Sequence, residues 1–397
     1  MFEKLEMAPP DPILGLTEAF NKDPNPDKIN LGVGVYQDAT GKTPVFSAVA
    51  RAEKVMADKG ESKKYLPITG HPGYNAAVAE MVFGAGSEIL RAKRVAVCQS
   101  LGGTGGLRIG ADFAKKVAPD AKVWVSDPTW TNHLGIFGAA GFEIGAYPYY
   151  DPKTKAVDFE KMIEALKAIP RGHIVLLHAC CHNPSGADPT PQQWKTIAKV
   201  TAERGLLPFL DFAYQGFGDG LEKDAVGVRA MAETGQEMLI VASFSKNFGL
   251  YNERVGALLV VCKSAADAEK AISHVKIVVR QNWSNPPSHG ASIVAAILSD
   301  AGLRAEWEQE LKATCGRIHE MRRLFVETLK SKGVQRDFSF IIDQKGMFSF
   351  SGLSKEQVQT LRDKYAIYIV GSGRINVAGI TPGNVDRLCD AVADVLK

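Results

Sequence analysis

The 397-residue chain lacks long apolar runs and a strong excess of charge of either sign. No run of about eighteen apolar residues suggests a membrane span. The opening residues, Met1 to Glu6, do not have the charged-then-apolar order of a signal peptide. A formal net charge of +3 gives too weak a basic field to indicate nucleic-acid binding. We therefore expect a cytoplasmic protein that binds neither membranes nor nucleic acid.

Cysteines are few, and they lack the paired spacing of metal ligands. Six are present, and the adjacent pair Cys180-Cys181 indicates a reducing compartment. His178 and His182 flank this pair and could suggest zinc, but their motif is better explained by Asn183, which lies at a strand exit. We expect no metal.

Length and apolar content set the expected organisation. A chain of 397 residues with 45% apolar content exceeds one ordinary core, so two domains are expected. The middle of the chain alternates strand-like and helical stretches, which predicts an α/β fold with a largely parallel sheet between helices. A long charged helix is predicted over Ala305 to Lys330, with short strands around Phe338 to Ile342, Met347 to Phe350 and Ile375 to Ala378. That change of character predicts a second, smaller α/β domain.

A lysine among small hydroxyl residues is the most informative motif. The stretch Val241 to Gly249 reads VASFSKNFG and contains Lys246, and Arg254 follows it. A lysine that forms a Schiff base needs burial or a neighbouring cation to lower its pKa. Small hydroxyls beside an arginine suit a phosphate dianion. Pyridoxal phosphate needs both, together with a carboxylate for its ring nitrogen. A surface lysine in a serine-rich turn is the alternative.

Two apolar runs lead into polar residues that can meet a ligand. The run Leu207 to Leu210 ends in Asp211, with Tyr214 three residues on, and the run Ile174 to His178 leads to Asn183. Ligand sites in α/β folds lie at the carboxyl ends of strands, so Asp211 is a candidate for the ring nitrogen. For each residue taken alone, a turn former or a helix cap is the alternative.

Another strand exit is rich in glycine. Val95 to Arg108 reads as a strand, a glycine-rich turn and an amphipathic helix, which lets backbone N–H groups approach a phosphate. The turn does not fit the dinucleotide pattern G-x-G-x-x-G, and no acidic residue ends a second strand about twenty residues later. A cradle for a single phosphate is the better interpretation. Just beyond, Trp130 could stack on a flat ring and His133 could bond a buried carboxylate, with a place in the core as the alternative for both.

Together these motifs resemble class I pyridoxal phosphate aminotransferases, most closely the aspartate and aromatic amino acid aminotransferases of bacteria. The likeness runs along nearly the whole chain. Further stretches similar to the family are Asn30 to Tyr36, Asp211 to Phe217, Asn282 to Pro287, Gly346 to Phe350 and Ser372 to Val377. The resemblance implies the fold-type I architecture of pyridoxal-phosphate-dependent transferases, with a mostly parallel seven-stranded sheet between helices in a large domain, plus a smaller α/β domain.

The resemblance also implies domain boundaries and a partner. It implies an amino-terminal arm over residues 1–10, a large cofactor-binding domain over 44–311, and a small domain made of 11–43 and 312–397. The opening Pro9 to Pro12 fits an arm laid across a partner subunit, with a disordered tail as the alternative. A homodimer is expected on the same ground.

The family's cofactor residues can be carried over one by one. By resemblance, Lys246 holds pyridoxal phosphate and moves the proton between the substrate Cα and the cofactor carbon. Asp211 is expected to pair with the protonated ring nitrogen, with His133 and His178 behind it. Tyr214 joins Lys246 and Asp211 in the expected catalytic set. The remaining expected contacts are Asn183 and Tyr214 at the ring oxygen, Trp130 on the ring face, Gly103, Thr104, Ser243, Ser245 and Arg254 at the phosphate, and Tyr65 from the neighbouring subunit.

Two separated arginines indicate a substrate with two acid ends. Arg374 matches the family's clamp for the α-carboxylate, which an arginine can grip with two parallel hydrogen bonds. Arg280 matches the arginine that reaches from the other subunit to the side-chain carboxylate of dicarboxylic substrates, and a surface cation is the alternative for either. Gly34, Trp130 and Asn183 complete the substrate-binding set that the resemblance implies.

Finer positions favour aspartate over aromatic substrates. Aromatic-preferring relatives tend to carry serine where this chain has Thr104 and Asn285, and larger apolar residues where it has Val35 and Thr43. All four positions look aspartate-like here. The positions that depart from the aspartate enzymes are Lys64, Gln37 and Ser185.

The expected reaction is reversible transamination between L-aspartate and 2-oxoglutarate, giving oxaloacetate and L-glutamate through the pyridoxamine form of the cofactor. An aromatic or broad-range aminotransferase is the alternative. A non-catalytic regulator on the same fold is disfavoured, because the catalytic set is complete.

Overall fold

The computed structural model describes residues 1–8, 14–60 and 62–397, and the chain forms two compact units. The large unit comprises residues 44–317, and the small unit comprises residues 1–43 and 318–397. The sequence-based boundaries fall after residues 43 and 311. The second boundary and its observed counterpart both lie inside one helix, α13 (Ala301–Ser331), where no break in the sequence pattern marks a change of unit. The proline-rich opening, Pro9 to Pro12, lies outside the described residues.

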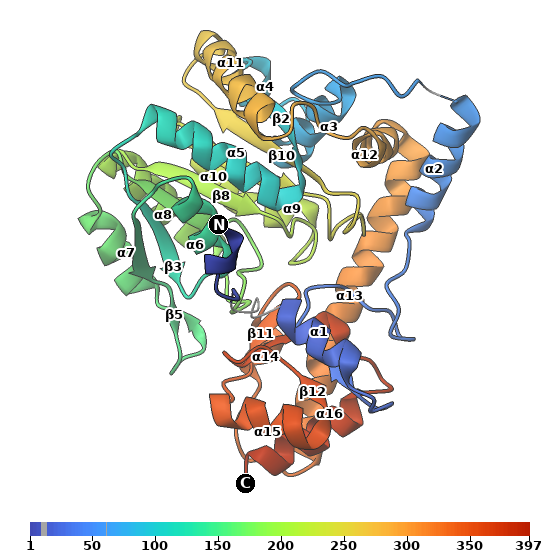
Figure 1. Cartoon of the computed structure of the whole chain (residues 1–397). Helices are drawn as coiled ribbons and strands as arrows, with labels where there is room; N and C mark the ends of the chain where they lie inside the picture. The colour runs from blue at the N-terminus through green and yellow to red at the C-terminus, as the bar shows by residue number, and fades with distance from the viewer. Residues whose placement is uncertain (9–13, 61) are drawn as a thin grey trace. The chain divides into compact units, whose positions relative to one another are not determined.

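The large unit is built on a seven-stranded sheet with the order β2-β10-β9-β8-β7-β3-β4 (Figure 1). Its strands are β2 (Val95–Leu101), β3 (Val123–Asp127), β4 (Ile144–Pro148), β7 (Ile174–His178), β8 (Leu207–Phe212), β9 (Met238–Ser243) and β10 (Val255–Val261). Strand β10 runs antiparallel to β2 and β9, and the other neighbouring pairs are parallel. The expected mostly parallel seven-stranded sheet is confirmed. A separate hairpin pairs β5 (Tyr150–Asp151) with β6 (Ala156–Val157).

Several helices of the large unit pack against its sheet (Figure 1). The helices of this unit are α2 (Ser47–Lys59), α3 (Pro72–Phe83), α4 (Glu88–Arg91), α5 (Gly102–Val117), α6 (Asn132–Ala139), α7 (Phe159–Ala168), α8 (Pro191–Arg204), α9 (Leu221–Asp224), α10 (Val226–Glu233), α11 (Ala265–Asn282), α12 (His289–Ser299) and the first part of α13. Every position of β7, β9 and β10 is buried. A strand covered on both faces has no polar side, which explains why these segments read as continuous apolar runs.

Glycines let α5 lie close to the sheet. A Cβ at Gly106 would lie 2.6 Å from Cγ1 of Val241 in β9, and a Cβ at Gly110 would lie 2.6 Å from Cζ of Phe209 in β8. Part of the glycine-rich stretch therefore serves helix–sheet packing, and only its first residues can serve a ligand.

The strand directions gather several loops at one edge of the sheet. Because β10 is antiparallel to both β2 and β9, the remaining strands all point the same way. The loops after β2, β3, β7, β8 and β9 therefore leave from the same edge, and β10 begins there.

The small unit has its own core. Its elements are a 3₁₀ turn (Phe2–Lys4), α1 (Leu14–Lys22), β1 (Ile29–Asn30), the end of α13, α14 (Phe340–Asp343), β11 (Phe348–Phe350), α15 (Lys355–Tyr365), β12 (Ile367–Tyr368), β13 (Arg374–Asn376), a 3₁₀ turn (Val377–Gly379) and α16 (Val385–Val395). Strands β1 and β12 pair in parallel, and β11 and β13 pair antiparallel. Phe325, Leu361 and Leu388 pack in a core that joins α13, α15 and α16.

One expected strand is wrong. The stretch around Phe338 to Ile342 contains the short helix α14 instead. The carboxylate of Asp337 accepts hydrogen bonds from the N–H of Ser339, at 2.8 Å, and from its hydroxyl, at 3.0 Å, which starts a turn. Phe338 and Ile341, three residues apart, are both buried, as in a helical turn and unlike the alternation of a strand.

Among the helices of the described residues, none is long and apolar enough to cross a membrane.

Candidate active site

The polar residues expected to bind a ligand occupy the loop-bearing edge of the large sheet. Asp211 is the penultimate residue of β8, and His178 and Ser243 end β7 and β9. Lys246 follows β9, and His133 lies in the first turn of α6.

The centre of this site is a buried carboxylate. Asp211 is only 8% exposed, and its Oδ2 accepts a hydrogen bond from Nε2 of His133 at 3.0 Å. Its Oδ1 is buried and has no hydrogen-bond partner within residues 1–8, 14–60 and 62–397. Burial alone would raise the pKa of Asp211, but the hydrogen bond from His133 and the charge of Lys246 outweigh it and hold the pKa below its usual value. The carboxylate is therefore ionised at neutral pH and keeps one oxygen open to a donor.

Hydrogen-bonded side chains hold the ring nitrogen of His133 that does not contact Asp211. Thr129 Oγ1 lies 2.8 Å from Nδ1 of His133 and 3.1 Å from Nε2 of His178. Burial lowers the pKa of His178 to about 3 against the opposing effect of Asp211, so His178 is neutral. One arrangement of protons then satisfies the chain: His178 donates to Thr129, Thr129 donates to His133, and His133 donates to Asp211.

Sequence reasoning assigned no role to Thr129. The only available signal was a hydroxyl placed four residues before His133, and its importance depends on His178 arriving from another strand.

A third histidine extends this support. His182 is fully buried, with Nε2 3.0 Å from Ser126 Oγ and Nδ1 2.7 Å from Ser185 Oγ. Its ring lies 4.3 Å from that of His178, and burial holds its pKa well below the usual value. Both ring nitrogens bond to serines, so the structure gives His182 a supporting role in the loop that carries Asn183.

Lys246 presents an amine with a lowered pKa. Its Nζ lies 4.7 Å from the ring centroid of Tyr214, which is itself buried. Burial of the amine, aided by the charge of Arg254 and opposed by that of Asp211, lowers the pKa of Lys246 from 10.5 to about 8. A neutral amine is a nucleophile, so this lysine is prepared for attack on a carbonyl carbon.

A cup for an anion adjoins the lysine. Ser243 and Ser245 are buried, with their hydroxyl oxygens 3.3 Å apart. A Cβ on Gly103, in the first turn of α5, would lie 3.3 Å from the Cβ of Ser243, and a Cβ on Gly102 would lie 2.6 Å from the guanidinium of Arg254. The start of a 16-residue helix, two hydroxyls and an arginine therefore converge. This combination suits a phosphate.

The other expected contacts of the large unit differ in exposure. Asn183 is buried in the loop after β7, and Trp130 is half-buried with its ring at 86° to that of His133. Thr104 is exposed in the first turn of α5. Tyr65 is 89% exposed, and Arg280 is exposed in the last turn of α11, where it bonds to Ser284. In the described part of the chain, neither Tyr65 nor Arg280 forms a hydrogen bond with the cup.

The small unit holds the remaining expected residues, Arg374 and Gly34. Arg374 is 4% exposed, and its Nη2 donates to the carbonyl of Gly32 at 2.6 Å. Its guanidinium carbon lies 4.2 Å from the ring centroid of Phe348. A Cβ on Gly34 would come within 2.7 Å of the same ring. The two residues expected to contact substrate thus share one aromatic neighbour.

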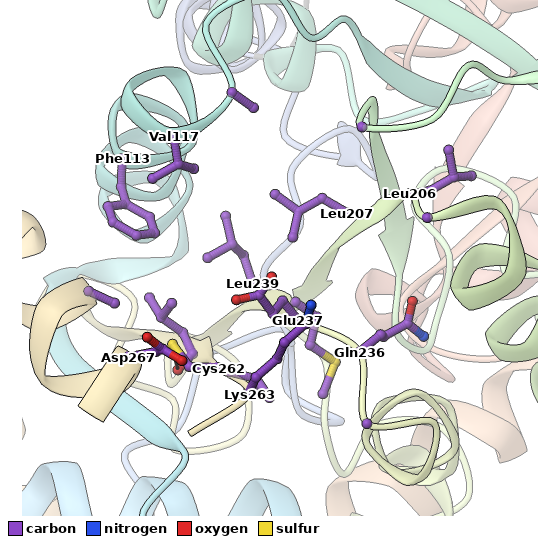
Figure 2. A pocket seen from close by; sticks show the side chains of 18 of the residues that line it. Phe113, Val117, Leu206, Leu207, Gln236, Glu237, Leu239, Cys262, Lys263 and Asp267 are labelled. Atoms are coloured by element: carbon purple, nitrogen blue, oxygen red, sulfur yellow. Dashed lines mark hydrogen bonds between the residues drawn. The ribbon is translucent and has the colours of Figure 1, made fainter. Parts of the chain in front are cut away.

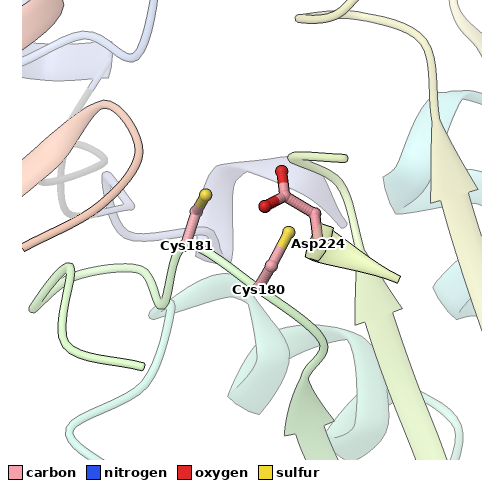
Figure 3. Close-up of side chains that lie close together, drawn as sticks. All are labelled: Cys180, Cys181 and Asp224. Atoms are coloured by element: carbon pink, nitrogen blue, oxygen red, sulfur yellow. The ribbon is translucent and has the colours of Figure 1, made fainter. Parts of the chain in front are cut away.

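Two cysteines lie beside a carboxylate that sequence reasoning missed. Figure 3 shows Cys180, Cys181 and Asp224, whose possible ligand atoms lie within 4.8 Å of one another. The carboxylate of Asp224 accepts N–H groups from Gly216, Gly218 and Asp219 at 2.7 to 2.9 Å. Its observed role is therefore to hold the loop that follows β8 and Tyr214.

A cavity of about 670 Å³ lies at the opposite edge of the same sheet (Figure 2). Leu207 and Met238, which begin β8 and β9, line it, together with Phe113 near the end of α5. It shares no residue with the cup or with Asp211 and its supports.

Comparisons with known proteins agree with this geometry. A family model described as aminotransferase class I and II matches residues 26–392. The aspartate aminotransferase of Escherichia coli (strain K12) is 52% identical over 396 residues, and the aromatic-amino-acid aminotransferase of the same organism is 46% identical over 397 residues. Both comparisons cover 100% of each chain.

A solved structure is also similar over its full length. The aromatic-amino-acid aminotransferase of Burkholderia pseudomallei, covalently bound to pyridoxal phosphate, has a TM-score of 0.98 and 50% identity, with 100% of each chain covered. The match of the family model over most of the chain, together with these full-length relatives, shows that the chain belongs to the class I and II aminotransferases.

Proposed function

We propose that this aminotransferase moves an amino group reversibly between L-aspartate and 2-oxoglutarate, giving oxaloacetate and L-glutamate, with pyridoxal 5'-phosphate as cofactor. The 52% identity to a protein named aspartate aminotransferase supports the reaction. The chemistry of the site supports the cofactor, as does the Burkholderia pseudomallei relative that binds it covalently.

The observation that carries the proposal is the open oxygen of Asp211. A buried anion with an unused lone pair needs a cationic donor, and the protonated ring nitrogen of the cofactor is such a donor. Because the pKa of Asp211 is held low, the carboxylate stays ionised and would keep the ring nitrogen of a bound cofactor protonated. When bound, the cofactor supplies an electron-withdrawing ring that stabilises negative charge at the substrate Cα.

Lys246 and the cup fit the other two groups of the cofactor. The hydroxyls of Ser243 and Ser245, the first turn of α5 with Gly103 and Thr104, and Arg254 are the donors for the phosphate. The amine of Lys246 meets the aldehyde. With a pKa of about 8, roughly a tenth of the amine is neutral at pH 7. With the substrate amine joined to the cofactor in its place, the freed amine of Lys246 would be the base that accepts the Cα proton.

Three further residues orient the ring. We assign Asn183 and Tyr214 to its oxygen and Trp130 to its face. Burial of Asn183 and Tyr214 and the fixed contact of Trp130 with His133 favour a rigid cradle.

Two arginines are assigned to the substrate. Arg374, with Gly34 beside the same phenylalanine ring, is assigned to the α-carboxylate, and its burial and ring contact hold the guanidinium in one orientation. Arg280 is assigned to the side-chain carboxylate of a substrate in the neighbouring subunit. Tyr65 is assigned to the neighbouring subunit's phosphate. Both side chains are exposed in the single chain, as we expect of residues that act across a subunit boundary.

A homodimer in the cytoplasm fits these assignments. The six cysteines are all free of disulfides, which accords with a reducing compartment.

A broad-range or aromatic aminotransferase is the second candidate, favoured by the 50% identity to the Burkholderia pseudomallei enzyme. Initial rates with aspartate and with phenylalanine, each against 2-oxoglutarate, separate the two candidates. We expect a higher kcat/KM with aspartate. A clear preference for phenylalanine would reverse the order of the candidates.

Arg280→Ala should lower kcat/KM for aspartate by at least about 100-fold, because a carboxylate loses its charged partner, and should change that for phenylalanine by less than about fivefold. Lys276→Ala, an exposed cation one turn earlier on α11, is the matched control and should change neither. Equal losses with both substrates would reject the assignment of Arg280.

Asp211→Asn should lower kcat/KM by at least about 100-fold, because the amide still accepts the bond from His133 but cannot keep the ring nitrogen protonated. Asp211→Glu, which moves the charge without removing it, should retain more activity than the amide. An amide variant as active as the wild type, with cofactor bound, would contradict the role of this carboxylate.

The lowered pKa of Lys246 predicts how the cofactor-free protein takes up an aldehyde. The rate of adduct formation with pyridoxal, which lacks a phosphate that titrates, should rise with pH and level off above a midpoint near 8. Arg254→Gln removes a cation that lowers this pKa, so its midpoint should move upward. Lys246→Ala should form no borohydride-stable adduct at this position. A wild-type rate still rising tenfold per pH unit at pH 9.5 would show that the amine is not depressed.

A further inference from the structure

The aromatic ring that contacts Arg374 is that of Phe348, which belongs to a short strand. Phe348 begins β11, which pairs antiparallel with β13 so that Phe348 faces Asn376 and Phe350 faces Arg374. The ring of Phe348 touches the guanidinium of Arg374 and packs against the backbone at Gly34. The position of β11 therefore controls the surroundings of the arginine that is assigned to the α-carboxylate.

A buried arginine of α13 holds that strand. Arg322 is fully buried in the small unit. Its Nη1 donates to the carbonyl of Ile341 at 2.9 Å and to Oγ of Ser349 at 2.5 Å. Its Nη2 donates to the carbonyls of Gly346 at 2.7 Å and Phe348 at 2.9 Å. One guanidinium thus joins α14, the turn at Gly346 and β11.

Phe348 links the two arginines. Its carbonyl accepts a hydrogen bond from Arg322, while its ring stacks under Arg374. Ser349, the next residue, accepts the other bond that Arg322 makes to β11. Two successive residues of the strand are therefore fixed by Arg322, which leaves the ring of Phe348 little freedom to shift.

We propose that Arg322 is a positioning residue for substrate binding, acting through β11 and the ring of Phe348 on the orientation of Arg374. The inference rests on the proposed assignment of Arg374 to the α-carboxylate. On this proposal, Arg322 keeps the guanidinium of Arg374 oriented before the substrate binds.

The chemistry of the contact requires an arginine. A planar guanidinium sends donors from two nitrogens to four acceptors in fixed directions, whereas a lysine ammonium has three donors at one point. Arg322→Lys preserves the charge and most of the apolar stem but cannot reach all four acceptors. It should loosen β11 without removing the side chain from the core.

The test measures binding separately from turnover in the cofactor-saturated enzyme. For Arg322→Lys we expect KM for aspartate, and the Kd of the non-reacting dicarboxylate succinate, to rise by about tenfold. We expect kcat to change by less than about twofold, because the residues that handle the proton belong to the large unit. The affinity for pyridoxal phosphate should not change. Arg323→Lys, the exposed neighbour on α13, is the matched control and should leave all four quantities unchanged.

A purely structural role gives a different pattern. A lower melting temperature with unchanged KM and succinate Kd would overturn the proposal, since loss of folded enzyme reduces the apparent kcat alone. If Arg322→Lys does not fold, Ser349→Ala and Phe348→Leu replace it. Ser349→Ala deletes one acceptor and should raise KM by about threefold, and Phe348→Leu removes the ring face and should raise KM in the same direction. Unchanged KM in both would equally overturn it.

Arg374→Lys, measured in parallel, separates this inference from the proposed function. If Arg374→Lys raises KM and the Arg322 series does not, the positioning role fails and the substrate assignment stands. If Arg374→Lys leaves KM and the succinate Kd unchanged, the assignment of Arg374 fails, and the inference fails with it.

Discussion

The burial of one ionised carboxylate, with an oxygen left open, is the constraint around which the large unit is organised. Asp211 stays charged at this buried edge of the sheet because His133 donates to its other oxygen, Thr129 and His178 hold His133 in place, and the charge of Lys246 lies nearby. A charge in such a place is costly unless a partner completes it. Burial also lowers the pKa of the neighbouring amine of Lys246 to about 8, so that a minor fraction of it is neutral at pH 7. The site therefore combines a fixed anion with a lysine that is easily neutralised, which is the combination that the proposed cofactor would need.

Strand direction explains how residues so far apart in the sequence meet. Six strands point to one edge, and the antiparallel β10 begins there directly after Arg254. The hydrogen bond from the N–H of Gly102 to the carbonyl of Arg254 ties the start of α5 to the start of β10. The anion cup is thus a product of sheet topology, with local sequence supplying only the small residues that allow the close approach of Gly102 and Gly103.

Much of this could be read from the sequence, because apolar runs that end in a polar residue mark strand exits directly. Asp211, Asn183 and the segment of Lys246 all follow such runs, and the resemblance to a known family supplied the roles. Thr129 could not be found in this way, since its partner His178 comes from a distant segment that only the folded chain brings near. Asp224 was missed although its partners lie only five to eight residues earlier, because the groups that it accepts are backbone N–H groups, which leave no mark in the sequence. The strand predicted around Phe338 to Ile342 was wrong for a local reason. Its aromatic and β-branched residues favour a strand, but the carboxylate of Asp337 starts a helical turn.

Comparison of two buried aspartates shows how the fold separates binding from support. Asp224 accepts three backbone N–H groups, so its capacity is used in fixing the loop after β8. Asp211 accepts one hydrogen bond from a side chain and keeps Oδ1 open. Backbone N–H groups can donate to a carboxylate only where the loop itself lies against it. The imidazole of His133 instead reaches the carboxylate as a side chain, and other side chains hold the ring in place. Support through His133 therefore leaves room for a ligand on the other side of the carboxylate, and support through backbone N–H groups would have closed it.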